Sequence, residues 1–150
     1  MAASMRCAKQ ARRAPPDARY ANVARHACFA MRGMHAATPP SPRFQVLEVA
    51  ILAVQTLRPV VARIRQCDRD LGEQIRRALS SVALNIGEAN RSEGGNRLSR
   101  FSTAAGSNAE VRAALRVAVA WGYVSGTEVE AGEQLLDRIA AMLYKLGTRH

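Results

Sequence analysis

Arginine is the residue type in this chain best suited to a chemical task, because its planar guanidinium can hold phosphate oxygens through two hydrogen bonds. Arg112 and Arg116 are four residues apart and would share one face of a helix. Other arginines lie around a Gly-Gly pair at residues 94–95. The candidate phosphate-binding residues are Arg76, Arg77, Arg91, Arg97, Arg100, Arg112 and Arg116. Such a surface predicts sequence-independent binding of nucleic acid.

The competing interpretation of these arginines is a solvated helix face with local ion pairs. Glu73 precedes Arg77 by four residues, the spacing of a helical ion pair, and Glu110 is close to Arg112 in sequence. No aromatic residues alternate with the arginines, which argues against a platform that stacks single-stranded bases. Both interpretations remain open from the sequence.

A polar strip forms the second pattern of interest. Ser81, Asn85 and Glu88 follow the spacing i, i+4 and i+7, so they lie on one face of a helix, and Asn108 can face them from the next helix. A polar strip inside a bundle could bind a ligand. It more commonly fixes the register of helices or a subunit contact through hydrogen bonds, and we expect that structural role.

Residue arrangements typical of catalysis are missing from the sequence. Glu88 is the only acid of the polar strip, and neither a histidine nor a second carboxylate accompanies it. The Glu-x-x-His pattern of di-iron bundles is absent, and Gly94-Gly95 lacks the Lys-Ser/Thr of a phosphate loop. Trp121 and Tyr123 are expected to be packing anchors at a helix end. The sequence therefore predicts a protein that is not an enzyme and uses no metal or cofactor.

Four segments with apolar residues at helical spacing must position these side chains. The predicted helices are residues 44–66, 70–90, 97–121 and 126–146, with a turn at residues 91–96. Helices of this length with short connections pack as antiparallel neighbours. The predicted fold is therefore all-α, an up-and-down four-helix bundle over residues 44–148.

Capping signals define the ends of the predicted helices. Asp68 or Asp70 can cap the second helix, Gly122 can end the third, and Ser125 with Glu128 forms a capping box before the fourth. Pro59 is expected to kink or split the first helix.

Two patterns predict close contacts. The first helix is apolar on more than one face, which favours self-association. Residues 104–109 are all small or short, so Gly106 is expected to mark a tight helix contact.

Charge is distributed unevenly along the chain. The net charge is +10, and residues 1–43 hold eight basic residues and one acid, hence +7. This Arg-rich and Pro-rich segment predicts a disordered basic tail. It also resembles an organelle transit peptide in composition. A third interpretation is that the true start is Met31 or Met34 and that the residues upstream are a misassigned extension.

Cysteine usage and hydropathy give the expected compartment. Cys7, Cys28 and Cys67 are too few and too scattered for a disulfide framework, and none has metal-ligand spacing. These features favour a reducing compartment, the cytoplasm. No run of apolar residues approaches the roughly 18 that suggest a membrane span, so we expect no membrane partner.

Three stretches of the sequence resemble the four-helix bundle proteins encoded in bacterial 23S ribosomal RNA intervening sequences. These stretches are residues 76–88 (RRALSSVALNIGE), 97–101 (RLSRF) and 105–112 (AGSNAEVR). Gly122-Tyr123 and the final amphipathic helix follow in the order typical of that family. The opening residues Phe44, Leu47, Glu48 and Val49 resemble its start, so the resemblance covers about 105 residues.

The resemblance implies an up-and-down bundle that assembles into a homopentamer and has no known catalytic activity. A related branch, the accessory variability protein of diversity-generating retroelements, is a basic pentameric partner of a reverse transcriptase and of nucleic acid. The sequence departs from the family where Ala50, Ile51 and Ala53 replace a Trp and a Lys-rich surface. It also reads Asn85-Ile86-Gly87-Glu88-Ala89 in place of Asn-Ile-Ala-Glu-Gly, and its only lysines are Lys9 and Lys145.

Two hypotheses for function follow. The first is a non-enzymatic homo-oligomer, a pentamer by resemblance, that binds structured RNA or DNA through an arginine surface multiplied by symmetry. The alternative is a protein-interaction scaffold or accessory subunit with no direct contact to nucleic acid.

Overall fold

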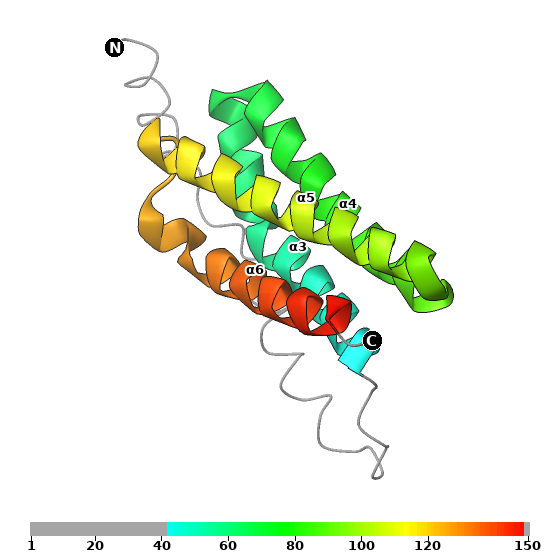
Figure 1. Cartoon of the computed structure of the whole chain (residues 1–150). Helices are drawn as coiled ribbons and strands as arrows, with labels where there is room; N and C mark the ends of the chain where they lie inside the picture. The colour runs from blue at the N-terminus through cyan, green and yellow to red at the C-terminus, as the bar shows by residue number, and fades with distance from the viewer. Residues whose placement is uncertain (1–41, 149–150) are drawn as a thin grey trace, which may run out of the picture.

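The computed structural model describes residues 42–148, with side chains described from Gln45 onward. This part of the chain is made of four helices and contains no strand (Figure 1). The helices are α3 (Pro42–Cys67), α4 (Arg69–Arg91), α5 (Gly94–Ala120) and α6 (Gly126–Gly147). The predicted all-α bundle is confirmed. The three interpretations of the N-terminal segment concern residues 1–43, of which 1–41 lie outside the described range. Residues 42 and 43 are helical, so α3 begins two residues before the predicted start.

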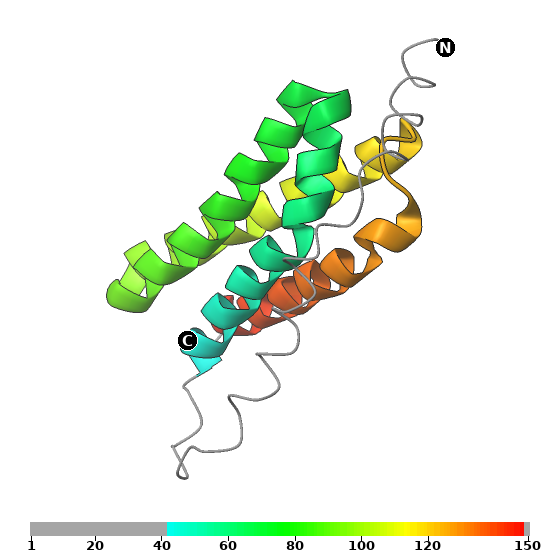
Figure 2. The same cartoon turned by 180° about the vertical axis from the view of Figure 1, so that it is seen from behind.

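Each helix packs against two neighbours. Both α3 and α5 lie between α4 and α6, so α3 and α5 occupy opposite corners of the bundle. Gln74 of α4 hydrogen-bonds to Glu110 of α5, whereas Glu88, later on α4, pairs with Arg100, earlier on α5. These two helices therefore run in opposite directions. Figures 1 and 2 show the α4–α5 hairpin lying beside the α3–α6 pair.

Aliphatic side chains fill the core. The largest fully buried ones come from all four helices, and Phe101 is the only aromatic residue among the buried residues of the described range. Removing such side chains from water supplies the main stabilising free energy, at about 25 cal/mol per Å² of apolar surface. The fully buried large aliphatic residues are Leu57, Ile64, Ile75, Ile86, Leu115, Leu136 and Ile139.

The predicted caps are confirmed. Asp68 Oδ1 accepts a hydrogen bond of 2.9 Å from the Leu71 N–H at the start of α4. Ser125 and Glu128 form both hydrogen bonds of the capping box before α6. Gly122 follows the end of α5 with φ +70°, and it donates its N–H to the Val119 oxygen while Tyr123 donates to the Ala118 oxygen. This pair of bonds is a Schellman motif, which requires a left-handed residue that glycine adopts without strain.

The predicted turn at residues 91–96 is wrong in length. Only Ser92 and Glu93 separate the helices, and α5 begins at Gly94, three residues before the predicted start. Gly94 has φ +55°, so the chain reverses direction at this residue, and Gly95 and Asn96 are already helical. The Gly-Gly pair therefore does not extend the break between the helices but allows a tight reversal.

Pro59 does not split α3, which runs unbroken through it. Proline removes the hydrogen bond that the carbonyl of Gln55 would accept. Both Pro59 and Gln55 are exposed, so water can satisfy that carbonyl.

The prediction that Gly106 marks a tight contact is also wrong. A Cβ at Gly106 would meet nothing within 4 Å. Close approach occurs at two other glycines. A side chain at Gly72 would overlap Arg65, and one at Gly132 would overlap Leu57 of α3.

Within the described residues, α3 is the one helix that could cross a membrane by length and composition, over Gln45–Cys67. Only 33% of its apolar window is buried, so much of this surface is uncovered in a single chain. Packing of α3 against α4 and α6 gives its inner face a role in the core.

Candidate nucleic-acid interface

The exposed face of α4 carries the largest group of candidate arginines. Arg76, Arg77 and Arg91 are all exposed, and the spacing of 14 residues between Arg77 and Arg91 returns to nearly the same side of a helix. Arg69, seven residues before Arg76, is exposed on the same side, and it is an addition to the arginines selected from the sequence. We call Arg69, Arg76, Arg77 and Arg91 the α4 arginine face. Arg77 and Arg91 are about 21 Å apart along the helix axis.

Three carboxylates share this side of α4: Glu73 lies within the α4 arginine face, and Asp70 and Glu88 are exposed at its edge. The Glu73 oxygens lie 2.8 Å from Arg76 Nε and 2.6 Å from an Arg65 side-chain nitrogen of α3. The hydrogen bond from Arg76 is the largest cause that lowers the pKa of Glu73 below its ordinary value, and the positive charges of Arg65, Arg76 and Arg69 lower it further. The pair expected between Glu73 and Arg77 is therefore replaced by pairs with Arg76 and Arg65.

The guanidinium of Arg77 therefore has no ion-pair partner among residues 45–148. Arg91, at the last turn of α4, is likewise exposed and without an ion-pair partner in that range. Free guanidinium groups can exchange water for phosphate without first breaking an ion pair. Together with Arg69, which is also exposed and without an ion-pair partner in that range, they are the side chains of the α4 arginine face most available to phosphate.

The start of α5 contributes Arg97 and Arg100. Arg100 is 2.9 Å from Glu88 and donates a 3.3 Å hydrogen bond to Asn85 Oδ1, so it ties the two helices together. Both partners of the Arg100–Glu88 pair are about half exposed, and such pairs contribute at most about 1 kcal/mol. Arg97 is half-buried. Arg100 thus has a structural bond that a phosphate would have to displace.

Arg112 and Arg116 do not belong to this surface. Arg112 is 2.6 Å from Asp137 of α6, on the side of α5 that faces α6. Arg116 follows one turn later on that side. The adjoining half of α6 is acidic, with Glu128, Glu130, Glu133 and Asp137. For Arg112 the ion-paired face is therefore the better interpretation, whereas Arg116 is exposed and has no ion-pair partner in the described part of the chain.

The polar strip lies between α4 and α5 as a hydrogen-bonded network. Ser81 Oγ is 2.8 Å from Ser107 Oγ, and Asn85 Nδ2 donates to the Ser81 carbonyl at 2.9 Å. Asn85 Oδ1 accepts from Arg100, and Glu88 pairs with the same arginine. The polar atoms of Asn85 are satisfied within the chain, which favours the structural role.

Asn108 does not face this strip. Its Nδ2 donates a 3.0 Å hydrogen bond to the main-chain oxygen of Leu136 on α6, and Ser107 takes the place opposite Ser81. The apolar spacing of α5 predicts correctly that Asn108 lies inside the bundle. The inward face of α5, however, contacts both α4 and α6. Sequence spacing does not distinguish between them.

The aromatic pair at the end of α5 is only partly an anchor. Trp121 and Tyr123 stack with ring centroids 6.4 Å apart, and Tyr123 packs against the core. The indole of Trp121 remains exposed.

The described bundle as a whole is close to neutral. Residues 45–148 contain 13 basic and 11 acidic residues, hence +2. The basic character is therefore local, on α4 and around the α4–α5 turn. No group of three His, Cys, Asp or Glu side chains in the described part of the chain could hold a metal ion.

Comparison with known proteins gives a family and a fold. A family model described as 23S rRNA-intervening sequence protein matches residues 44–145. The chain is similar to a crystal structure of a protein with unknown function from the S23 ribosomal protein family of Bacteroides thetaiotaomicron. That match has a TM-score of 0.59 and 17% identity, and it covers 72% of this chain and 99% of that chain. At this identity the likeness shows the fold alone. Comparison with curated proteins finds no match.

Proposed function

Since the chain belongs to the family of 23S rRNA-intervening sequence proteins, we propose that it is a non-enzymatic homo-oligomer that binds structured RNA in the cytoplasm. The observation that carries this proposal is the α4 arginine face, where four exposed arginines outnumber the three carboxylates Asp70, Glu73 and Glu88 on the same side of the helix. Arginine binds phosphate oxygens in pairs and does not read base sequence in this way. The expected binding is therefore sequence-independent.

Oligomerisation would make a weak surface effective. A single bundle with a net charge of +2 over residues 45–148 attracts a polyanion only slightly. Several copies held together present several α4 arginine faces to one RNA, and the second contact then occurs at high effective concentration. The family resemblance implies five copies, and the proposal adopts that number.

The test is RNA binding measured by fluorescence anisotropy with a labelled hairpin, at 50 to 200 mM KCl, on the full chain after nuclease treatment. Arg77→Gln with Arg91→Gln removes two charges from the α4 arginine face. We expect weaker binding and a salt slope that is less steep by about 1 for each phosphate that the variant no longer binds. Binding that does not depend on salt, or no binding by the unmodified chain, contradicts the proposal.

A matched control removes two charges elsewhere. Arg116→Gln with Arg138→Gln alters two exposed arginines away from α4 and gives the same net charge. This comparison also holds constant the +7 contributed by residues 1–43. Equally weakened binding in both variants means that net charge alone attracts the RNA. A protein partner that survives nuclease treatment in a pull-down would instead favour the scaffold function.

A further inference from the structure

The second half of the exposed side of α4 has an ordered composition. Arg77, Ser80, Leu84, Gly87 and Arg91 follow one another at spacings of 3, 4, 3 and 4 residues, so they form one row along the helix, which we call the α4 outer row. Its two ends are arginines about 21 Å apart along the helix axis. Neither arginine has an ion-pair partner among residues 45–148, and the three residues between them are short and uncharged.

Carboxylates stand beside the α4 outer row and not in it. Glu88 is exposed at its edge, where its Oε2 lies 2.9 Å from Nη1 of Arg100 on α5. Asp70 and Glu73 come earlier on the helix, before Arg77. The nearest negative charge is therefore offset by a neighbouring arginine, and a polyanion can approach the row between its two ends.

The middle of the row allows close approach. A Cβ at Gly87 would meet nothing within 4 Å, so open space lies directly over the backbone there. Leu84, one turn earlier, is 65% exposed and presents an aliphatic surface. Ser80 Oγ donates its proton to the Arg76 carbonyl at 3.0 Å, so its lone pairs are left to accept a hydrogen bond from outside the chain.

These features match the groove that an RNA duplex presents most openly. A-form RNA has a wide and shallow minor groove that displays 2′-hydroxyls, with phosphates along both of its sides. Arginines at the two ends of a row can reach phosphates on the two sides of such a groove. Between them, Leu84 would lie on the sugars, and Ser80 Oγ can accept a hydrogen bond from a 2′-hydroxyl.

A DNA duplex fits the α4 outer row less well. The minor groove of B-form DNA is about 6 Å wide, whereas a helix with its side chains is about 10 Å across. The major groove admits a helix, but its base edges are read by long polar side chains, and Ser80, Leu84 and Gly87 are too short for that. DNA also has no 2′-hydroxyl to donate to Ser80 Oγ.

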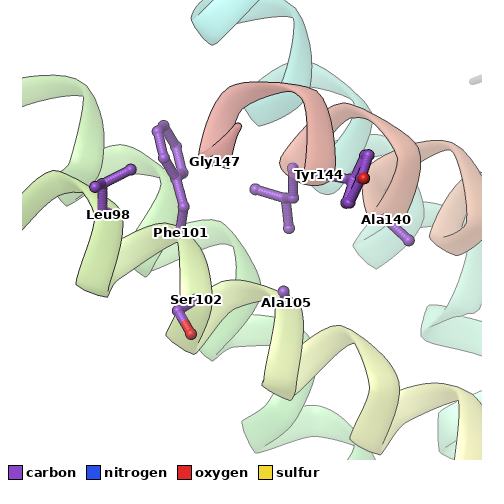
Figure 3. Close-up of a pocket in the computed structure, with 8 residues that line it drawn as sticks. Leu98, Phe101, Ser102, Ala105, Ala140, Tyr144 and Gly147 are labelled. Carbon is purple, nitrogen blue, oxygen red and sulfur yellow. The ribbon is translucent and has the colours of Figure 1, made fainter. Parts of the chain in front are cut away.

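Unpaired bases find no stacking platform beside the row. Proteins bind single strands by stacking bases on aromatic rings, and α4 contains no aromatic residue. An apolar cleft with Phe101 and Tyr144 in its lining does open between α5 and α6. Figure 3 shows Leu98 and Phe101 of α5 on one side of it and Ala140 and Tyr144 of α6 on the other. No charged side chain belongs to the lining that the described residues form, so a strand would gain no phosphate contact there.

We propose that the α4 outer row binds the minor groove of duplex RNA. Arg77 and Arg91 contact phosphates of opposite strands, and Leu84 lies on the sugars between them. Ser80 Oγ accepts a hydrogen bond from a 2′-hydroxyl. This inference rests on the proposed RNA binding, and it names the form of the RNA and the groove. Contacts of this kind depend on the shape of the duplex and not on its base sequence.

The test compares three labelled probes of one sequence by fluorescence anisotropy at one KCl concentration. The probes are an RNA duplex of roughly 20 base pairs, the corresponding DNA duplex and a single unstructured RNA strand. The nuclease-treated full chain is used throughout, so the +7 of residues 1–43 is common to every measurement. We expect the RNA duplex to bind about tenfold more tightly than either other probe.

Gly87→Gln places a neutral side chain in the middle of the α4 outer row. It should weaken binding of the RNA duplex about tenfold and binding of the single strand less than about twofold, because a flexible strand can pass around the added side chain. Gly106→Gln on α5 is the matched control. A Cβ there also meets nothing within 4 Å, so the same side chain is added without a clash, and the affinities for all three probes should stay unchanged.

Ser80→Ala removes the hydroxyl acceptor and leaves the shape of the row almost intact. It should reduce the preference for the RNA duplex over the DNA duplex about threefold without changing the affinity for DNA. Thr103→Val is the matched control, because Thr103 Oγ1 of α5 likewise donates to a carbonyl of its own helix, that of Ser99, at 3.0 Å. Circular dichroism checks that each variant keeps its helicity.

The possible results separate this inference from the proposed function. Salt-independent binding, or none, overturns both. Equal affinity for the three probes, or binding of the RNA duplex that Gly87→Gln does not weaken, overturns the groove contact and leaves RNA binding by the α4 arginine face standing. A mass in solution that falls with Gly87→Gln but not with Gly106→Gln means that a second copy covers the row, which also overturns the inference. An RNA preference that Ser80→Ala leaves unchanged overturns the 2′-hydroxyl contact.

Discussion

Asn108 of α5 donates a 3.0 Å hydrogen bond from Nδ2 to the main-chain oxygen of Leu136 of α6. Asn108 is only 2% exposed, and its Oδ1 has no hydrogen-bond partner in the described chain. The hydrogen bond from Nδ2 favours this particular pairing of α5 and α6. The unpaired Oδ1 lowers the net contribution to the stability of the fold, because burial removes that oxygen from water without giving it a new partner. Substitutions at residue 108 should therefore change the stability of the bundle, and an ionisable side chain there should make that stability depend on pH.

Asn108→Asp should destabilise the bundle by about 3 kcal/mol at pH 7, because it buries a carboxylate beside a carbonyl oxygen. Burial would raise the pKa of this carboxyl above its unfolded value of about 3.9. The unfolded chain then loses its proton at lower pH than the folded chain, so stability relative to the unmodified protein falls as pH rises from 4 to 7. Urea unfolding followed by circular dichroism at several pH values measures this effect.

Asn108→Leu is the control for that experiment. It removes the donor and the unpaired Oδ1 together, so the expected change is within about 1.5 kcal/mol and does not depend on pH. A pH-independent Asn108→Asp variant with the stability of the unmodified chain would contradict the burial of this site.

Gly132→Ala should destabilise the bundle by about 1 to 3 kcal/mol, since the new Cβ would overlap the buried side chain of Leu57 and force α3 and α6 apart. Gly87→Ala is the matched substitution, because a Cβ there meets nothing within 4 Å. Helix propensity predicts that it stabilises α4 by about 0.4 to 1 kcal/mol. Thermal unfolding of the two variants should therefore shift in opposite directions, and shifts of equal sign would argue against the Leu57–Gly132 contact.

The capping box of α6 should make the free energy of unfolding decrease at acidic pH. Hydrogen bonding from the Ser125 backbone is the largest cause that lowers the pKa of Glu128, and the Ser125 side chain and Arg63 lower it further. Because the pKa of Glu128 is lowered on folding, its carboxylate stabilises the folded chain at pH values above the ordinary pKa of 4.5. That stabilisation is lost as the pH falls through the folded-state pKa of Glu128. Glu128→Gln should reduce the loss of thermal stability between pH 5 and pH 2.5.

Ser125→Ala tests the same cap without altering a charge. It should lower stability by about 1 kcal/mol at neutral pH, because an N-terminal N–H of α6 loses its acceptor. It should also weaken the acid dependence, because the Ser125 side chain helps to lower the pKa of Glu128. If the Glu128→Gln variant follows the acid profile of the unmodified chain, Glu128 is not the titrating group.

The Ser81–Ser107 contact should show energetic coupling between α4 and α5. A double-mutant cycle with Ser81→Ala and Ser107→Ala is expected to give about 1 kcal/mol, because the two hydroxyls are 2.8 Å apart and part-buried. Ser80→Ala combined with Ser107→Ala is the control, since Ser80 Oγ donates to its own helix at the Arg76 carbonyl. Coupling of similar size in the control cycle would show that the first value does not report the hydroxyl contact.

Features that depend on neighbouring residues could be predicted from the sequence. The caps at Asp68 and Ser125 are examples, because an N-cap acts on backbone N–H groups only a few residues away. The inward stripe of each helix follows from apolar spacing for the same reason. The predicted start of α5 is wrong by three residues, since a glycine at positive φ can begin a helix directly after a tight reversal as well as break one.

Features that depend on which helices are neighbours could not be predicted. Gly106 and Gly132 are both glycines at helix interiors, yet only Gly132 faces another helix of the chain. Arg77 and Arg112 are equally plausible ligands for phosphate in the sequence. Their difference arises because Asp137 of α6 reaches Arg112, while the competing Arg76 and Arg65 take Glu73 away from Arg77.

The connectivity of the bundle imposes an order on its assembly during synthesis. The α4–α5 hairpin closes over a two-residue connection, so it can pair as soon as both helices have left the ribosome. The ion pair between Arg63 and Glu128 joins residues 65 positions apart, and α3 must remain half covered until α6 is made. Throughout that interval the side of α3 that packs on α6, including Leu57, stays exposed in the growing chain, and exposed apolar surface of this kind favours aggregation during folding.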